Sequence, residues 1–155
     1  MIAAVDTNIL LDMLIPDEEF VHESKALLDR YNEQGRLVIC EAVFAELSSQ
    51  FSSEVELDKF ISQTGIRLLR SDEKALALAG KAWREYSSRR PNSVLCSSCG
   101  SPVVASCSKC RTRLRPRQHI ISDFLIGAHA LLHADLLLTR DRGIYRSYFK
   151  ELEIG

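Results

Sequence analysis

Short apolar runs alternate along the chain with longer segments in which apolar residues recur at helical spacing. We predict strands at residues 2–5, 37–40, 66–69 and 136–139, with a last short strand near 152–154. Nearly unbroken apolar runs of four residues are typical of strands that are buried on both faces of a parallel sheet.

The segments between these runs are predicted to be helices. Several carry start or stop signals, such as Gly65 after one segment and Ser122 as a plausible N-cap of the last. The predicted helices begin near Ile9, Asp17, Glu41, Glu54, Ser71 and Ser122. Strands that alternate with helices predict an α/β fold, with a parallel sheet flanked by helices.

Residues 92–118 show neither helical nor strand periodicity, and the chain of 155 residues has the length of one domain. We therefore expect a single domain spanning residues 1–155, with 92–118 as an insert within it. Such a long irregular stretch is unusual in a compact domain unless something holds it in place.

Four cysteines in the insert form two C-x2-C pairs separated by seven residues: Cys96, Cys99, Cys107 and Cys110. In a reducing cytoplasm, which we expect for this chain, such pairs indicate a tetrahedral Zn²⁺ site before they indicate disulfides. Four cysteines leave no open coordination position, so the zinc would be structural. Disulfides or four free thiols remain the alternatives.

The composition is that of an ordinary folded protein, with 46% apolar and 26% charged residues and a net charge of −1. The charge is uneven, because nine Lys or Arg and a single acid lie between Lys81 and Gln118. Alternate positions after the last cysteine are arginines: Arg111, Arg113, Arg115 and Arg117. We hypothesise that they contact RNA phosphates. A solvated basic strand, or a surface for an acidic partner, is the alternative.

No targeting or membrane segment is apparent. The apolar N-terminus lacks a basic flank and is interrupted by Asp6 and Asp12. No stretch approaches the roughly 18 apolar residues that a membrane span needs.

Four acidic residues occupy positions where an α/β fold can gather them at one edge of the sheet. Asp6 directly follows the first apolar run, and Asp141 follows Thr139 at the end of the fourth. Glu46 lies inside a predicted helix, and Asp123 lies near the start of another. Ligands of open α/β sheets bind beyond the carboxyl ends of the strands. Clustered carboxylates suit Mg²⁺ or Mn²⁺, and these ions suit chemistry on phosphate esters. Each acid taken alone is more typical of a cap or a turn.

The sequence around these acids resembles the motifs of the PIN-domain family of nucleases. Residues 5–11, 44–47, 122–130 and 138–141 resemble, in this order, the four acidic motifs of that family. The resemblance covers nearly the whole chain apart from the insert. In size and motifs, the chain is most similar to the VapC-type toxins of toxin–antitoxin pairs.

This resemblance implies a parallel sheet of about five strands between helices, and Mg²⁺- or Mn²⁺-dependent cleavage of single-stranded RNA. It implies that Asp6, Glu46, Asp123 and Asp141 hold the metal, that Thr7 or Asn8 orients the first carboxylate, and that Thr139 hydrogen-bonds near the fourth. It also implies a small antitoxin protein as partner, and a homodimer. Two alternatives remain, a regulatory RNA-binding module without catalysis and a PIN nuclease of RNA processing with no antitoxin.

Several residues are given ordinary structural roles at this point. Cys40 is interpreted as a small buried hydrophobe, and Asp12 as a cap or turn residue. His129 and His133, four apart on one helix face, could bind metal, but a surface or packing role is favoured because no third ligand is obvious. His119 carries no signal.

Overall fold

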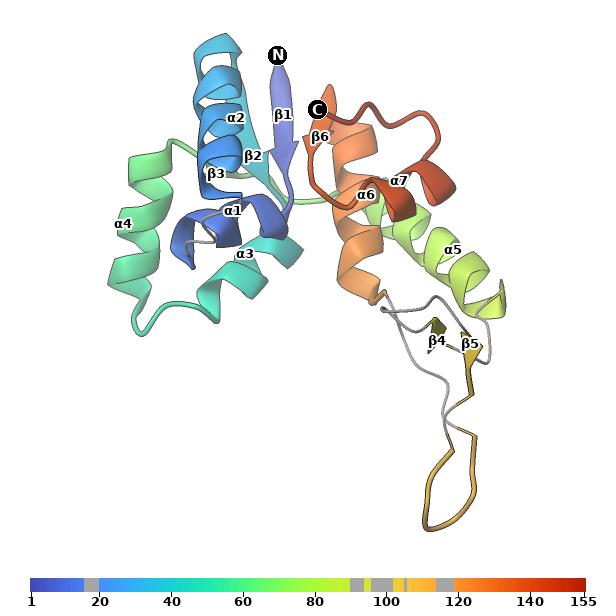
Figure 1. The fold of residues 1–155 in the computed structure, drawn as a ribbon. Helices are drawn as coiled ribbons and strands as arrows, with labels where there is room; N and C mark the ends of the chain where they lie inside the picture. The colour runs from blue at the N-terminus through green and yellow to red at the C-terminus, as the bar shows by residue number, and fades with distance from the viewer. Residues whose placement is uncertain (16–19, 90–93, 96–101, 105, 114–118) are drawn as a thin grey trace.

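The structure is a computed structural model that describes residues 1–15, 20–89, 94–95, 102–104, 106–113 and 119–155 (Figure 1). Its strands are β1 (Ile2–Val5), β2 (Arg36–Ile39), β3 (Arg67–Leu68), β4 (Val94–Leu95), β5 (Pro102–Val103) and β6 (Leu136–Leu138). Its helices are α1 (Thr7–Leu14), α2 (Val21–Gln34), α3 (Glu41–Ser48), α4 (Glu54–Thr64), α5 (Glu73–Arg89), α6 (Ile121–His133) and α7 (Arg142–Tyr148).

The main sheet is parallel and has the strand order β3-β2-β1-β6. Ala3 of β1 is in register with Leu37 of β2 on one side and with Leu136 of β6 on the other. Because β1 and β6 are parallel neighbours, the residues that follow them leave the sheet side by side at one edge. The predicted α/β fold with a parallel sheet is confirmed.

The expected count of about five strands is not confirmed, because the sheet has four strands in the part of the chain that the structure describes. The run near 152–154 makes only an isolated parallel bridge, between Ile154 and Leu137. Leu137 donates to the carbonyl of Glu153 at 2.9 Å and accepts from the backbone N–H of Gly155 at 3.0 Å. One residue pair is too short to count as a strand, although it adds to the sheet where a fifth strand was expected.

Helices cover both sides of the sheet. In Figure 1, α5, α6 and α7 lie to the right of the strands, α4 lies at the far left, and α2 is drawn over β2 and β3. None of the helices in the described ranges is long and apolar enough to cross a membrane.

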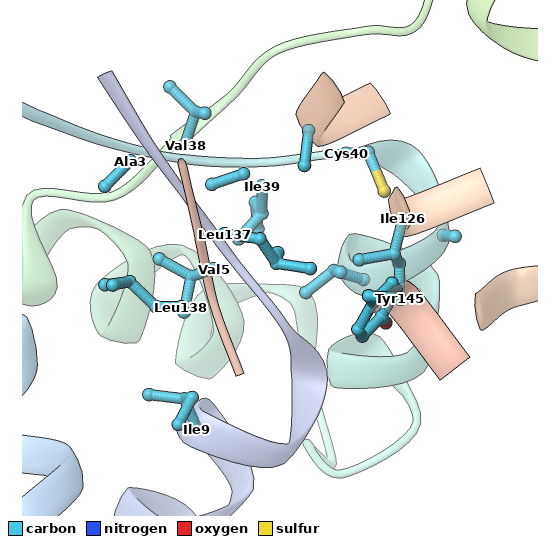
Figure 2. Packing of buried hydrophobic residues seen from close by; sticks show 14 of the residues in the cluster. Ala3, Val5, Ile9, Val38, Ile39, Cys40, Ile126, Leu137, Leu138 and Tyr145 are labelled. Atoms are coloured by element: carbon cyan, nitrogen blue, oxygen red, sulfur yellow. The ribbon is translucent and has the colours of Figure 1, made fainter. Parts of the chain in front are cut away.

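The core lies where the strands meet the helices, and Figure 2 shows residues of this one cluster from the strands, such as Val5, Ile39 and Leu137, and from α6, such as Ile126. All four residues are at most 3% exposed. Strands buried on both faces explain why their sequences are apolar without alternation. Cys40 is 2% exposed within this cluster, which confirms its interpretation as a buried hydrophobe.

The start of α6 differs from the sequence prediction. The helix begins at Ile121 after an N-cap at Ile120, so Ser122 is not its N-cap. The carboxylate of Asp123 accepts the backbone N–H of Ile120 at 2.9 Å, which satisfies one of the unpaired donors at the helix start. This bond fixes Asp123 at the end of α6 that faces the same edge of the sheet as Asp6.

The insert contains regular structure that its sequence did not predict. β4 and β5 form an antiparallel pair, and Ser106 forms an antiparallel bridge with Arg113. Runs of two residues are too short to produce a recognisable alternation, which is why the sequence prediction missed them.

Candidate functional site

Asp6 is the centre of a hydrogen-bond network at the carboxyl ends of β1 and β6. Asp6 is buried, with 5% of its surface exposed. Oδ2 accepts from the Thr139 hydroxyl at 2.6 Å, from Asn8 Nδ2 at 2.8 Å and from the Tyr145 hydroxyl at 3.1 Å. Oδ1 accepts from the backbone N–H of Thr7 at 2.7 Å. The first carboxylate is therefore held in one position by four donors.

Glu46 is connected to this network through Thr7. The Thr7 hydroxyl donates to Oε2 of Glu46, which lies on α3. Thr7 is the first residue of α1, so the bond links the end of β1 to the middle of α3. Of the two residues expected to orient Asp6, Asn8 does so with its side chain, whereas the Thr7 side chain holds Glu46.

Asp123 and Asp141 lie on either side of His119. Its Nδ1 is 3.5 Å from Oδ2 of Asp123 and 4.0 Å from Oδ2 of Asp141. The His119 ring packs edge-on against Tyr86, with centroids 5.7 Å apart, and its backbone N–H donates to the Tyr86 hydroxyl at 3.2 Å. His119, Tyr86 and Asp141 line a hollow of about 400 Å³. His119 thus joins the third and fourth acids beside a concave surface.

Thr139 ties the first acid to the fourth. Its hydroxyl oxygen donates to Asp6 and accepts from the backbone N–H of Asp141 at 3.0 Å and from Asn8 Nδ2 at 3.1 Å. Asp141 itself is half exposed, so its carboxylate is free to reorient. The position of Thr139 agrees with the expectation that it bonds near the fourth acid.

The electrostatics indicate that the four acids share one region. Burial raises the pKa of Asp6 to about 6, against hydrogen bonds that lower it, and the charge on Asp123 raises it further. Burial also raises the pKa of Asp123, and the charges on Glu46 and Asp141 add to this effect. The pKa of the Tyr145 hydroxyl is raised by burial and then by the charge on Asp6. The surroundings of Asp6 and Asp123 therefore disfavour the charged form of both carboxylates.

This donor set fits a hard divalent cation, because it offers carboxylate oxygens at the edge of the sheet and a cation would relieve their repulsion. The side chains do not yet form a coordination shell. Across the described ranges, no three His, Cys, Asp or Glu side chains already surround a point as metal ligands. Asp123 interacts electrostatically with each of the other three acids, and holding one ion would require their side chains to move.

Two of the four insert cysteines lie in the described residues. Cys107 and Cys110 belong to a tight turn that ends at Arg111, which has φ 61° and donates its backbone N–H to the Cys107 carbonyl at 2.9 Å. Hydrogen bonds with Thr112 and with Cys107 lower the pKa of the exposed Cys110 thiol to about 7. Neither described cysteine of the insert is in a disulfide. Cys96 and Cys99 lie outside the described residues.

The arginine stretch is described only at Arg111 and Arg113, which are exposed. Both lie in the hairpin of residues 106–113, which extends away from the sheet and the helices in Figure 1. The fold does not bring these two side chains to the four acids. Arg115 and Arg117 lie outside the described residues.

Sequence reasoning missed three residues of the site region. His119 stands four positions before Asp123, and this spacing carried no signal because His119 precedes the first residue of α6. The sequence analysis assigned no role to Tyr145, which donates to Asp6 at 3.1 Å. Asp12, interpreted as a cap or turn residue, instead lies within α1, where it is 4% exposed and pairs with Arg140 at 2.8 Å.

The comparisons with known proteins agree with this architecture. The PIN domain family matches residues 3–150. No curated relative matched the chain.

Two solved structures have a similar fold. VapBC-1 from nontypeable Haemophilus influenzae is 18% identical with a TM-score of 0.61, over 100% of this chain and 97% of that chain. VapBC2 from Rickettsia felis, bound to a DNA fragment from their promoter, is 15% identical with a TM-score of 0.57, over 100% of this chain and 98% of that chain. At these identities the likeness shows a shared fold.

Proposed function

Since the chain belongs to the PIN domain family, we propose that it is a ribonuclease that uses Mg²⁺ or Mn²⁺ to cleave single-stranded RNA. The observation that carries the proposal is the position of Asp6, a buried carboxylate that accepts hydrogen bonds from three side chains and interacts electrostatically with Asp123. A fold rarely buries such a charge without a functional or ionic partner.

Some residues of the chain hold the acids in place by hydrogen bonds, and one acid is left open to a bound RNA. Asn8, Thr139 and Tyr145 fix Asp6, and Thr7 fixes Glu46. Asp141 is half exposed and lines the hollow next to His119, and Asp123 lies 3.5 Å from the same histidine. We propose that this hollow receives the RNA backbone.

In this proposal Asp6, Glu46, Asp123 and Asp141 hold the divalent ion directly or through water. When bound, such an ion lowers the pKa of a coordinated water and stabilises negative charge on phosphate oxygens. The chain's own contribution is a buried Asp6 that four donors hold in place and a half-exposed Asp141 at the hollow. No Ser or Cys nucleophile is required.

The test is RNA cleavage with Mg²⁺ or Mn²⁺ by the wild-type chain and by Asp6→Asn. Asp58→Asn is the matched control, because Asp58 is an exposed acid on α4. Cleavage by the wild type and the control, with loss of at least about 100-fold in Asp6→Asn, supports the enzyme. RNA binding without cleavage by any of the three supports the non-catalytic RNA-binding module instead.

We also propose that a small antitoxin protein binds and inhibits the chain, so that the chain is the toxin of a pair. The support is the fold shared with VapBC-1 and VapBC2. The test is co-expression with the small protein encoded next to this chain, if there is one. Growth arrest by the chain alone and relief by the neighbour support the pair. Growth that is unaffected by the chain favours a PIN nuclease of RNA processing.

We also propose that the chain forms a homodimer, which light scattering tests by measuring its mass in solution.

We propose that Cys96, Cys99, Cys107 and Cys110 bind a structural Zn²⁺. The support is the sequence spacing, together with the tight turn and the lowered pKa of Cys110. Zinc content measured for the wild type and for Cys107→Ser/Cys110→Ser tests it, and equal zinc in both would contradict it.

We propose that the four arginines after the last cysteine contact RNA phosphates. Replacing Arg111, Arg113, Arg115 and Arg117 should then weaken RNA binding and flatten its salt dependence.

A further inference from the structure

A second group of polar side chains lies apart from the acids, between the start of α5 and the end of α6. The Ser71 hydroxyl donates to Oε2 of Glu41 at 3.0 Å. The Ser71 hydroxyl oxygen also lies 3.2 Å from Nδ1 of His129. Because the single O–H of Ser71 is used in the hydrogen bond to Glu41, the Ser71 oxygen can only accept a hydrogen bond from His129. Nδ1 of His129 therefore carries the proton, and Nε2 carries a free lone pair.

That free nitrogen is buried without a partner. His129 is 1% exposed, and its Nε2 makes no hydrogen bond to any described residue. Buried polar atoms are almost always paired, so such an atom calls for an explanation. A histidine whose Nδ1–H is held by a hydroxyl or a carboxylate while Nε2 stays bare has the arrangement found in metal-binding histidines.

His133 supplies a second nitrogen at the same place. It lies one helical turn after His129, and the two rings have centroids 5.1 Å apart. Its Nε2 is also buried without a hydrogen bond, and it lies 3.4 Å from Oδ1 of Asp72. Two imidazoles that share an ion at metal–nitrogen distances of about 2 Å have centroids about 5 Å apart. The observed spacing matches.

We propose that His129, His133 and Asp72 form a second metal site, which takes a borderline dication such as Zn²⁺, Co²⁺ or Ni²⁺. Two imidazole nitrogens and one carboxylate are the donors that these ions prefer, whereas the oxygen-only acids at Asp6 suit Mg²⁺ or Mn²⁺. The third ligand missing from the sequence prediction is Asp72, which precedes α5.

The site closes by a small movement. No three ligands already converge among the described residues. The two imidazole rings lie side by side, however, and the half-exposed Asp72 side chain already has its Oδ1 within 3.4 Å of His133 Nε2. Burial lowers the pKa of His129 to about 4, so its ring is neutral, the form that binds metal. A bound ion would link the start of α5 to the end of α6.

The experiment is a Co²⁺ titration followed by visible absorption. The full chain carries Cys107→Ser/Cys110→Ser, which breaks the thiolate site on an exposed hairpin, and excess Mg²⁺ is present to occupy the acids. One equivalent of Co²⁺ should bind with d–d bands and no sulfur charge-transfer band. The same ion should raise the unfolding temperature.

Three variants in this background locate the site. His133→Ala should weaken binding by at least about 100-fold, since loss of a positioning partner alone costs about 10–100-fold. Asp72→Asn should weaken it at least tenfold while still capping α5 through the Ala75 N–H. His22→Ala changes an exposed histidine on α2 and should leave binding unchanged.

The outcomes are decisive for this site without reference to RNA cleavage. His133 lies at the last residue of α6, so its replacement leaves the fold intact, which circular dichroism verifies. No Co²⁺ binding in the background chain overturns the proposal. Equal binding by His133→Ala and His22→Ala overturns it as well.

Discussion

The hydroxyl of Thr139 donates a hydrogen bond of 2.6 Å to Oδ2 of Asp6 and so joins the residues that follow β6 and β1. Both residues are buried, at 3% and 5% exposure. The bond exists because β1 and β6 are parallel neighbours, which brings residues 133 positions apart to the same edge of the sheet. The first acid of the candidate site is therefore positioned by the sheet itself.

Thr139→Val should damage both stability and cleavage. Valine has the shape of threonine but cannot donate to Asp6 or accept from Asp141 and Asn8. We expect a loss of about 1–3 kcal/mol in the free energy of unfolding, the usual cost of leaving buried polar groups unpaired. Urea unfolding measures it. Thr139→Ser keeps the hydroxyl and should retain most of the stability, so an equal loss in both variants would contradict this role.

Asp6 should make the metal-free protein less stable as the pH rises. Its pKa is about 6 in the folded chain, against 3.8 as the ordinary value. A raised folded pKa means that the stabilising contribution is complete below about pH 4 and is lost as the pH rises through 6. Two pKa units correspond to about 3 kcal/mol at most.

Urea unfolding in EDTA between pH 4 and 7 measures this dependence. Asp6→Asn should lack it, so the difference in unfolding free energy between the variant and the wild type should shift in favour of the variant as the pH rises. Adding Mg²⁺ at pH 7 should stabilise only the wild type. Parallel pH profiles for the two proteins would show that Asp6 does not titrate as described.

Arg140 and Asp12 should contribute to stability as a partly buried ion pair. Their side chains are 2.8 Å apart, with Asp12 5% exposed and Arg140 39% exposed. Arg140→Gln would leave a buried carboxylate with only the Ser24 hydroxyl, which donates at 2.6 Å. After allowance for solvent screening at Arg140, we expect a loss of about 1–3 kcal/mol.

The matched control is the exposed pair of Arg89 and Glu85, 3.0 Å apart on α5 with side chains 72% and 45% exposed. Arg89→Gln should cost less than about 0.5 kcal/mol in thermal or urea unfolding. If the two variants lost equal stability, burial of Asp12 would not be the cause.

The positions of β1, β2 and β6 were predictable because these strands are almost wholly buried and therefore read as apolar runs. The acid after β1 was predictable for the same reason, since Asp6 follows directly on Val5. The supporting contacts were not, because they depend on which elements pack together. Nothing near Asp12 in the sequence indicates that its partner is Arg140, 128 positions later.

The histidines show the same limit more clearly. The spacing of His129 and His133 was visible, but the third side chain came from residue 72, which precedes a different helix. His119 carried no signal because its contacts with Asp123 and Asp141 arise only once α6 begins beside the end of β6. Periodicity locates elements, and packing between elements decides which polar groups meet.

Two glycines on neighbouring helices should respond in opposite ways to alanine. A Cβ atom at Gly127 of α6 would lie 2.4 Å from Cε2 of Phe149 and 3.0 Å from Cδ1 of Tyr145, whereas a Cβ at Gly80 of α5 would meet nothing within 4 Å. Gly127→Ala must displace buried rings, one of which, Tyr145, also holds Asp6. We expect it to lower the free energy of unfolding by about 1–3 kcal/mol. Gly80→Ala should raise the free energy of unfolding by about 0.5–1 kcal/mol, because alanine has a higher helix propensity than glycine at an exposed helix position. Thermal unfolding of both variants tests the packing between α6 and α7, and a Gly127→Ala protein as stable as the wild type would mean that the two helices are less tightly packed than described.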